Sequence, residues 1–416
     1  MSISNTRSSG FDIINRLAGI ALFLYIICTT AFENNPGTSK YATITLYSFI
    51  LLSSFYILLK GKVKVNYYNI AIFIYGIFLM ISWLYTPDKE YGLKTLYWYF
   101  TCGILTFLVI NYIDTKEKIN LIIKAYIIGG FVLCMLALKI YGWDIFNQIE
   151  RSRYGIRVGG ELGNENSIGL ACGYSILFSV YLMMYTKLRK KFFLLYMIVI
   201  ICCFILAMLT SSKKALVLII LGTILLFISK GTEKTGIFNR LKYLIISFVI
   251  LFLFKFLLQN VKAFWYINMR VEEFINTIFG TGAASLSDIK RLHMIKQGLE
   301  VFRSNPYVGR GVAVSKYYFG TYSHNNYVEI LMNTGAIGFI IYYSSYFISL
   351  IRLTKINDVF HNFKKIALIC LLLTLGLEVG LVDYYSRYNQ IMFALISAFV
   401  SIYYNNNGTE SVIFCE

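Results

Sequence analysis

Long apolar stretches alternate with short polar connections along the whole chain. A helix needs roughly 20 mainly apolar residues to cross a bilayer. Stretches of this kind lie near residues 15–32, 41–59, 67–86, 95–112, 119–140, 166–186, 192–210, 214–230, 241–258, 326–351, 365–383 and 388–404. In lipid, a spanning segment must pair its own backbone groups, as a helix does. The pattern therefore predicts an all-α fold, a polytopic transmembrane helical bundle of about 12 spans.

The spans and the longer polar segments divide the chain into four parts. We expect N-terminal transmembrane helices at 1–140, central transmembrane helices with a Ser-Lys-Lys hairpin at 141–258, a large extracytoplasmic loop at 259–325 and C-terminal transmembrane helices at 326–416. Apolar residues recur at three- and four-residue steps from Leu286 to Phe302, which predicts an amphipathic helix inside the loop. The helix should end before Pro306, and the glycines of "GRG" (309–311) should let the next turn approach a ligand closely.

The amino-acid composition agrees with a polytopic membrane protein. Hydrophobic residues make up 57% of the 416 residues and charged residues 14%, whereas soluble domains have about 45–50% and 25%. The first apolar stretch follows a short polar start without a small-residue cleavage motif. We therefore expect a retained first span rather than a signal peptide.

The positive charges orient the bundle. With the N-terminus in the cytoplasm, most Lys and Arg of the short connections fall on the cytoplasmic side, which is typical of membrane proteins. The predicted inner connections contain Lys60, Lys62, Lys64, Lys187, Arg189, Lys190, Lys191, Lys230, Lys234, Arg240, Lys242, Arg352, Lys355, Lys364 and Lys365. Both termini are then cytoplasmic. The net charge of +18 follows from this distribution, so we expect a lipid bilayer as partner and no nucleic acid.

Two lysines break the charge rule. Lys213 and Lys214 lie in "LTSSKKALVLII" at the outer end of a predicted span. A single lysine there could extend to the lipid phosphates. Two of them, directly after Ser212 at the start of a helix, favour an anion site, because a helix N-terminus adds free N–H groups and a positive dipole end. Arg291, in the amphipathic helix, is another candidate cation, with an ordinary solvated side chain as the alternative.

A polar cluster, "HNNYVE" (324–329), stands where a predicted span begins. Asn326 and Glu329 fit a capping box, and Asn325 could cap as well. His324 has no capping role and suits a proton acceptor for a hydroxyl group, the alternative being an interfacial histidine bonded to a lipid headgroup. Cations and a base on the outer side favour a lipid-borne diphosphate donor, since ATP and nucleotide sugars are absent there.

Other motifs add little. Seven of the eight cysteines lie at or within predicted spans, and no CxxC pair, P-loop or His/Cys cluster at metal-ligand spacing is present. We therefore expect no cofactor and no metal. Tyr317, Tyr318, Tyr322 and Tyr327 could stack on sugar rings, although interfacial aromatic belts explain most tyrosines.

Four stretches resemble the O-antigen ligases and the O-antigen or capsule polymerases of bacterial envelopes. They are "GNENSIGLA" (163–171), "LTSSKKALVLIILG" (209–222), "RLHMIKQGLEVFRSNPYVGRG" (291–311) and "HNNYVEILMNTGAIGF" (324–339). The resemblance implies a metal-independent, inverting glycosyltransferase of the bacterial inner (cytoplasmic) membrane with an extracytoplasmic active site. Its donor and acceptor would be oligosaccharides linked to undecaprenyl diphosphate, and a chain-length regulator and a flippase are possible partners.

The resemblance also assigns roles. His324 matches the histidine that activates the acceptor hydroxyl, and Arg291 matches the arginine that contacts the donor diphosphate. Lys213 falls where the family usually has arginine. Lysine keeps the charge but loses bidentate geometry, and Lys214 could share the role. The matched motifs also contain four supporting residues, Asn164, Ser212, Asn325 and Glu329.

Members of this family differ in the acceptor that receives the glycan. We favour a polymerase, because the chain is rich in Lys, Ile, Asn and Tyr and its hairpin departs from the usual arginine. A ligase that transfers polymer to lipid A core or another surface acceptor is the first alternative. The second is a secondary transporter, for which Glu378 and Asp383 are the best intramembrane candidates. These two carboxylates could equally line a glycan cavity.

Overall fold

The computed structural model describes residues 2–33, 35–145, 157–233, 237–281, 285–356, 361–406 and 413–415. Each predicted span coincides with a helix. Within the described residues, eight helices are long and apolar enough to cross a membrane by length and composition, and a shorter apolar helix spans Tyr67–Trp83. The prediction of an all-α, polytopic membrane protein is confirmed.

The chain forms two compact units. The first comprises Met1–Gly19, Ile50–Ile119 and Leu286–Glu416, and the second comprises Ile20–Phe49 and Asn120–Ser285. Three helices contribute to both units: α1 (Ser2–Phe32), α2 (Ser39–Lys60) and α5 (Lys116–Tyr141). The four-part division drawn from the sequence remains a prediction.

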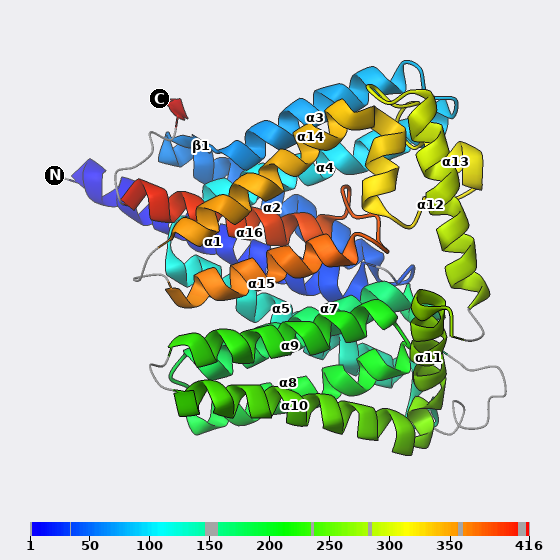
Figure 1. Ribbon diagram of the computed structural model, residues 1–416. Coiled ribbons are helices and arrows are strands. Elements are labelled where there is room, and N and C mark those ends of the chain that lie inside the picture. Colours follow the sequence, from blue (N-terminus) through cyan, green and yellow to red (C-terminus); the bar gives the residue numbers. More distant parts are fainter. Residues whose placement is uncertain are drawn as a thin grey trace. The chain divides into compact units, whose positions relative to one another are not determined.

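The first unit is built around long helices that pack side by side (Figure 1). They are α3 (Tyr67–Trp83), α4 (Lys89–Tyr112), α14 (Asn326–Lys355), α15 (His361–Leu377) and α16 (Arg387–Asn406). Side-chain caps fix two of their starts, since Asn66 caps α3 and Asp88 caps α4. A short antiparallel ribbon joins β1 (Val63–Val65) to β2 (Ile413–Cys415).

Two shorter helices pack near the beginning of α14. The predicted amphipathic helix is α12 (Leu286–Ser304), which ends just before Asn305-Pro306, and α13 (Val314–Phe319) follows it. A Cβ on Gly298 of α12 would lie 2.4 Å from a Val328 side-chain atom and 2.9 Å from the Met332 sulfur. The glycine therefore lets α12 pack directly against α14, with Val314 completing a small hydrophobic cluster.

The second unit is a helical bundle with α7 near its centre. It contains α5 (Lys116–Tyr141), η1 (Gly160–Leu162), α7 (Glu165–Tyr185), α8 (Lys190–Leu209), α9 (Lys213–Glu233), α10 (Ile237–Asn260), η2 (Lys262–Phe264) and α11 (Trp265–Phe279). The most apolar window of α7 is 78% buried, whereas that of α10 is 11% buried. Because α10 is apolar and exposed, we assign its surface to lipid contact.

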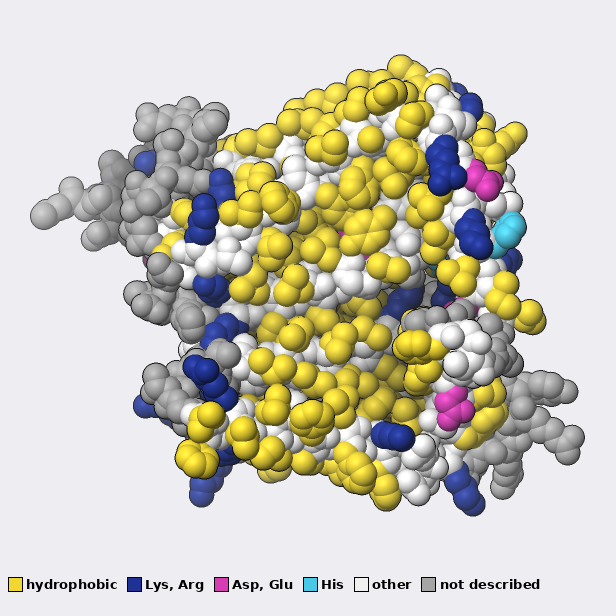
Figure 2. All heavy atoms as spheres, viewed as in Figure 1, with side chains coloured by type: hydrophobic (Ala, Val, Ile, Leu, Met, Phe, Trp, Pro, Cys, Tyr) yellow, Lys and Arg dark blue, Asp and Glu magenta, His cyan; other side chains and the backbone are white. Residues whose placement is uncertain are grey.

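Both units expose apolar side chains in a way that suits a bilayer. In the view of Figure 2, hydrophobic side chains cover the sides of the helices, and Lys and Arg side chains gather near helix ends. Leu58 and Phe252 are 75% and 68% exposed, respectively. A soluble protein would gather such large apolar patches into an interface. The chain is therefore an integral membrane protein.

α14 is broken near its first third. Gly335 has φ 65° and ψ −165°, which lies outside the helical region. The loop after α12 fills the break: Ala336 N–H donates to the Pro306 carbonyl (2.8 Å) and Arg310 N–H donates to the Met332 carbonyl (2.8 Å). A Cβ on Gly309 would lie 2.5 Å from the backbone of Asn333. The "GRG" turn therefore approaches the protein's own backbone at α14, and the approach of a ligand to this turn stays a prediction.

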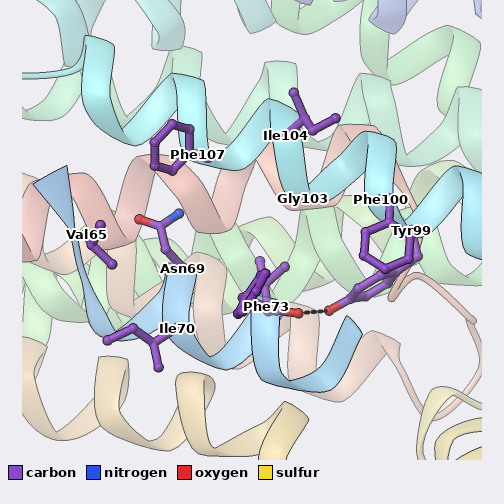
Figure 3. Close-up of a pocket in the computed structure, with 10 residues that line it drawn as sticks. Val65, Asn69, Ile70, Phe73, Tyr99, Phe100, Gly103, Ile104 and Phe107 are labelled. Atoms are coloured by element: carbon purple, nitrogen blue, oxygen red, sulfur yellow. Dashed lines mark hydrogen bonds between the residues drawn. The ribbon is translucent and has the colours of Figure 1, made fainter. Parts of the chain in front are cut away.

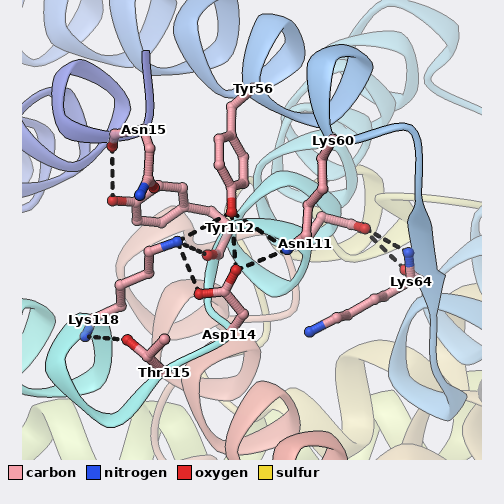
Figure 4. Close-up of polar contacts among 9 residues, drawn as sticks. All are labelled: Asn15, Tyr56, Lys60, Lys64, Asn111, Tyr112, Asp114, Thr115 and Lys118. Atoms are coloured by element: carbon pink, nitrogen blue, oxygen red, sulfur yellow. Dashed lines mark hydrogen bonds and ion pairs between the residues drawn. The ribbon is translucent and has the colours of Figure 1, made fainter. Parts of the chain in front are cut away.

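A half-buried ionic cluster lies at the junction of α2, β1 and α4 (Figure 4). The Asp114 carboxylate accepts hydrogen bonds from Lys60 Nζ (2.7 Å) and Tyr56 OH (2.9 Å), and Lys118 Nζ lies 2.9 Å from its other oxygen. The Lys118 ammonium also lies 4.1 Å from the Tyr112 ring centroid. This one carboxylate therefore joins the end of α2 to the start of α5.

An apolar cavity of about 520 Å³ separates α3 from α4 (Figure 3). Phe73, Phe100, Ile104 and Phe107 contribute to its walls, and Tyr99 OH donates to the Ile72 carbonyl (2.8 Å) beside it. An apolar lining of this kind suits a hydrocarbon chain rather than a sugar or a phosphate.

Candidate functional site

His324 lies in the loop that leads into α14. Its backbone has φ 60°, the left-handed region, and its side chain is half-buried. The imidazole ring centroid is 4.2 Å from the ring centroid of Tyr322. The next residue, Asn325, is the N-cap of α14, because its side chain accepts from Val328 N–H at 3.0 Å. Histidine and asparagine are among the residues that tolerate positive φ, so the local sequence suits this bend.

The capping box expected at Asn326 and Glu329 is not formed, and that prediction was wrong. Glu329 is buried, and its carboxylate accepts from Ser315 Oγ (2.5 Å) and Ser323 N–H (2.8 Å). Asn326 is also buried, and its side-chain oxygen accepts from Asp383 N–H at 3.2 Å. Glu329 therefore holds the loop before His324 in place rather than capping the helix.

Arg291 lies on α12 in the same unit as His324. Its guanidinium is 3.7 Å from the Asp288 carboxylate, one turn earlier. Burial raises the pKa of the Tyr322 phenol, and the positive charge of Arg291 opposes that shift. Tyr322 is in ring contact with His324. The first unit therefore contains the predicted base and one predicted cation.

Of the other tyrosines expected near sugars, Tyr317 and Tyr318 are exposed on α13. Tyr327 lies in the helix packing instead, with its ring stacked on Tyr343 (centroids 5.0 Å apart) and its OH donating to the Leu375 carbonyl. Tyr322 is therefore the member of this group that contacts the candidate base.

The α8–α9 hairpin carries the remaining predicted cations. Lys213 and Lys214 begin α9 and are both half-buried. The Lys213 ammonium lies 5.1 Å from the ring centroid of Phe274 in α11, a distance at which cation–π attraction operates. Ser212 is buried, and its hydroxyl donates to Asn166 Oδ1 (3.0 Å). Ser212 therefore braces the hairpin against α7.

Asn164, one of the four supporting residues, has a structural role. Asn164 is the N-cap of α7, and its side-chain oxygen accepts from Asn166 N–H and Ser167 N–H. A Cβ on Gly169 of α7 would lie 2.8 Å from Ala215 Cβ. The "GNENSIGLA" motif thus begins a helix and lets it pack tightly on the hairpin.

Arg157 is a cation that the sequence analysis missed. Its Nε donates to the Thr210 carbonyl at the hairpin turn (2.9 Å), and a terminal nitrogen lies 3.6 Å from Glu165 Oε2. The neighbouring Val158 N–H donates to the Leu209 carbonyl (3.0 Å). Arg157 lies between the predicted spans 119–140 and 166–186, in a connection that the charge-based orientation places on the outer side, where cations are disfavoured. The same argument that singled out Lys213 could have found it.

Glu378 and Asp383 are fully buried at the end of α15. Tyr343 OH and Tyr346 OH donate to the Glu378 carboxylate (2.7 and 2.9 Å), and Asn389 Nδ2 donates to Asp383 (2.8 Å). Both carboxylates belong to the interior, which argues against the expectation that they line a cavity. α15 ends at Leu377, before the predicted 383, because this hydrogen-bonded loop replaces its last turn.

The predicted residues form two groups. Arg291, His324, Asn325 and Glu329 lie in the first unit, whereas Asn164, Ser212, Lys213 and Lys214 lie in the second. The structure places each group within one compact unit. Convergence of the two groups on one substrate stays a prediction.

Comparisons with known proteins bear on this arrangement. A family model described as O-antigen ligase matches residues 198–343. The matched region contains Lys213, Lys214, Arg291 and His324. No curated protein matches the chain. This match does not distinguish a polymerase from a ligase, so the preference for a polymerase stays a prediction. Residues 198–343 are therefore similar to the O-antigen ligase family, a family of glycosyltransferase-like enzymes of O-antigen processing, and this match confirms the resemblance drawn from the sequence.

Proposed function

We propose that this protein polymerises oligosaccharide repeat units. It would transfer glycan from undecaprenyl diphosphate to a hydroxyl of a lipid-linked acceptor unit. The observation that supports this most is that the region matched by the O-antigen ligase family contains Arg291 and His324, with the His324 ring in contact with Tyr322. The reaction would take place on the extracytoplasmic face of the bacterial inner membrane, with both termini in the cytoplasm. A flippase would supply the lipid-linked unit, and a chain-length regulator could act on the product.

The proposed step is a single displacement. The imidazole of His324 accepts the proton of the acceptor hydroxyl, and the oxygen attacks the anomeric carbon of the donor sugar. The bond from that carbon to the diphosphate oxygen breaks, and its electron pair leaves with undecaprenyl diphosphate. Attack from the face opposite the leaving group inverts the anomeric configuration.

Positive side chains would stabilise the departing diphosphate. Negative charge grows on the leaving oxygen as the bond breaks, so a fixed cation lowers the barrier. Arg291 can offer two parallel N–H donors to a phosphate, and Lys213 and Lys214 add charge at the N-terminal end of α9. Arg157 positions the hairpin through its bond to the Thr210 carbonyl.

The role of His324 is tested with His324→Asn. Asparagine tolerates the left-handed backbone of this position, so the variant removes the imidazole without forcing the loop to change. We expect polymer synthesis to fall by at least about 100-fold, the usual contribution of a general base. His293→Asn is the matched control, because His293 is an exposed histidine of α12. Membranes containing His324→Asn that still produce long polysaccharide would refute the role of the base.

The cation is tested in the same way. Arg291→Ala should raise the concentration of lipid-diphosphate donor needed for half-maximal rate, whereas Arg303→Ala, an exposed arginine at the end of α12, should leave it unchanged. Equal donor dependence in both variants would contradict a diphosphate contact at Arg291.

Because the matching family is described as O-antigen ligase, a ligase is the second candidate. The two functions give different deletion phenotypes. Loss of a polymerase leaves a single repeat unit on the surface anchor. Loss of a ligase leaves polymer on the lipid carrier, and that result would replace our proposal.

A further inference from the structure

Three cysteines converge in the interior of the second unit. Cys134 lies in α5, Cys172 in α7 and Cys203 in α8, and their sulfur atoms all lie within 4.8 Å of one another. The sulfurs of Cys134 and Cys203 are 3.7 Å apart. Cys172 and Cys203 are buried, and Cys134 is half-buried. Each of the three helices thus contributes one thiol to a common point.

The spacing suits metal coordination. A metal–thiolate bond of about 2.3 Å places two sulfurs about 3.8 to 4.0 Å apart at tetrahedral or trigonal angles. The Cys134–Cys203 separation is close to this value. A disulfide would join two sulfurs at about 2.05 Å and would give the third thiol no role. We propose that Cys134, Cys172 and Cys203 bind one thiophilic metal ion of the class of Zn(II) or Cu(I), which thiolates select.

The backbone around the thiols fixes their separations. A Cβ on Gly130 of α5 would lie 2.0 Å from Ser175 Oγ in α7 and 3.2 Å from the Cys203 sulfur in α8. Ser175 Oγ also donates to the Tyr126 carbonyl of α5 (2.8 Å). The three helices are therefore in direct contact beside the thiols. An ion would meet ligands that are already in place, which favours binding.

An ion also has a route to the site. A cavity of about 140 Å³ is lined by Cys134 and Cys202 and extends to Tyr141 and Trp143 at the end of α5, where Trp143 is exposed. Cys134 lies seven residues before the end of α5, which is roughly 10 Å along the helix. The site is therefore about two turns from the helix end.

Each thiol that becomes a thiolate ligand releases its proton to the solvent. Because an uncompensated charge is unfavourable in an apolar interior, we expect Zn(II) to bind with two thiolates and one neutral thiol, and Cu(I) with one thiolate and two neutral thiols. The ion would tie α5, α7 and α8 into one body. This role is independent of glycan transfer and of His324.

The test uses the full chain, purified in detergent with a phosphine reductant and stripped of metals by a chelator. Cd(II) is the probe, because its thiolate complexes give an ultraviolet charge-transfer band. We expect the band to saturate at one ion per chain and the midpoint of thermal unfolding to rise. Cys203→Ser and Cys134→Ser should each weaken binding by at least about 10–100-fold, the loss that follows removal of a mere outer-shell partner of a metal ligand.

Cys370→Ser is the matched control, since Cys370 is a buried thiol of the first unit. It should bind Cd(II) as the unaltered protein does. The proposal is overturned by the absence of a saturable band, or by a band that persists in both Cys134→Ser and Cys203→Ser. A Cys134–Cys203 disulfide found by mass spectrometry in protein isolated without reductant would also overturn it, in favour of a redox pair.

Discussion

Replacing Gly335 by alanine tests whether the break in α14 is required for the fold. Gly335 has φ 65°, a region that costs a non-glycine residue about 1–2 kcal/mol. An added Cβ would lie 2.4 Å from the carbonyl carbon and oxygen of Tyr307. The loop after α12 would have to move away from this contact.

The cost can be estimated from the contacts that such a movement breaks. The Ala336–Pro306 and Arg310–Met332 backbone hydrogen bonds join the loop to α14 on either side of Gly335, and each contributes roughly 1 kcal/mol. With the backbone strain, we expect Gly335→Ala to lower the free energy of unfolding by about 3–4 kcal/mol. The assay is thermal unfolding of the detergent-purified protein, followed by tryptophan fluorescence.

Gly376→Ala is the matched control. Gly376 is an exposed helical residue of α15, and a Cβ there would meet no atom within 4 Å. In a helix, alanine is more favourable than glycine by about 1 kcal/mol, so this variant should unfold at the same or a slightly higher temperature. If Gly335→Ala unfolds at the temperature of the unaltered protein, the break in α14 does not require glycine and our account of the loop is wrong.

Three further predictions concern single contacts. Burial raises the pKa of Asp114, but hydrogen bonds and charges from Lys60 and Lys118 lower it to about 2 overall. Its stabilisation of about 2 kcal/mol should be present above about pH 4 and lost as the pH falls through 2, and Asp114→Asn should abolish that pH dependence in chemical denaturation. Glu329→Gln places an NH₂ group against a donor and should lower stability by about 1–3 kcal/mol, with reduced polymer synthesis; unchanged synthesis counts against the bracing role. Asn164→Ala removes the cap of α7 and should cost about 1 kcal/mol, detectable as a lower unfolding midpoint.

The helices could be predicted from the sequence because each spanning segment must be apolar over its whole length. The ends of the helices were harder to predict. The run at 365–383 stays mostly apolar beyond Leu377, and only the bonds to Glu378 and Asp383 show where the helix stops. Two adjacent asparagines can both cap α14, and the choice of Asn325 depends on Asn326 having partners 57 residues away. The pattern of neighbouring residues in the sequence does not reveal partners that lie so far apart along the chain.

The candidate site, too, could be predicted only in part from the sequence. His324, Arg291 and Lys213 could be selected because a polar or charged residue at the edge of an apolar run needs an explanation. The ring contact of His324 with Tyr322 and the bond of Arg157 to the Thr210 carbonyl are tertiary contacts. The cysteine cluster draws on three separate helices, so no spacing of cysteines along the chain could reveal it.

The close packing of α12 on α14 through Gly298 affects how a substrate would be received. A helix held only by flexible tethers would have to become ordered when a polyanionic lipid arrives, and that ordering would weaken affinity. Here the helix that carries Arg291 is already immobilised when the chain folds. Recognition can therefore proceed as docking onto a rigid surface, with little loss of conformational entropy at the moment of encounter.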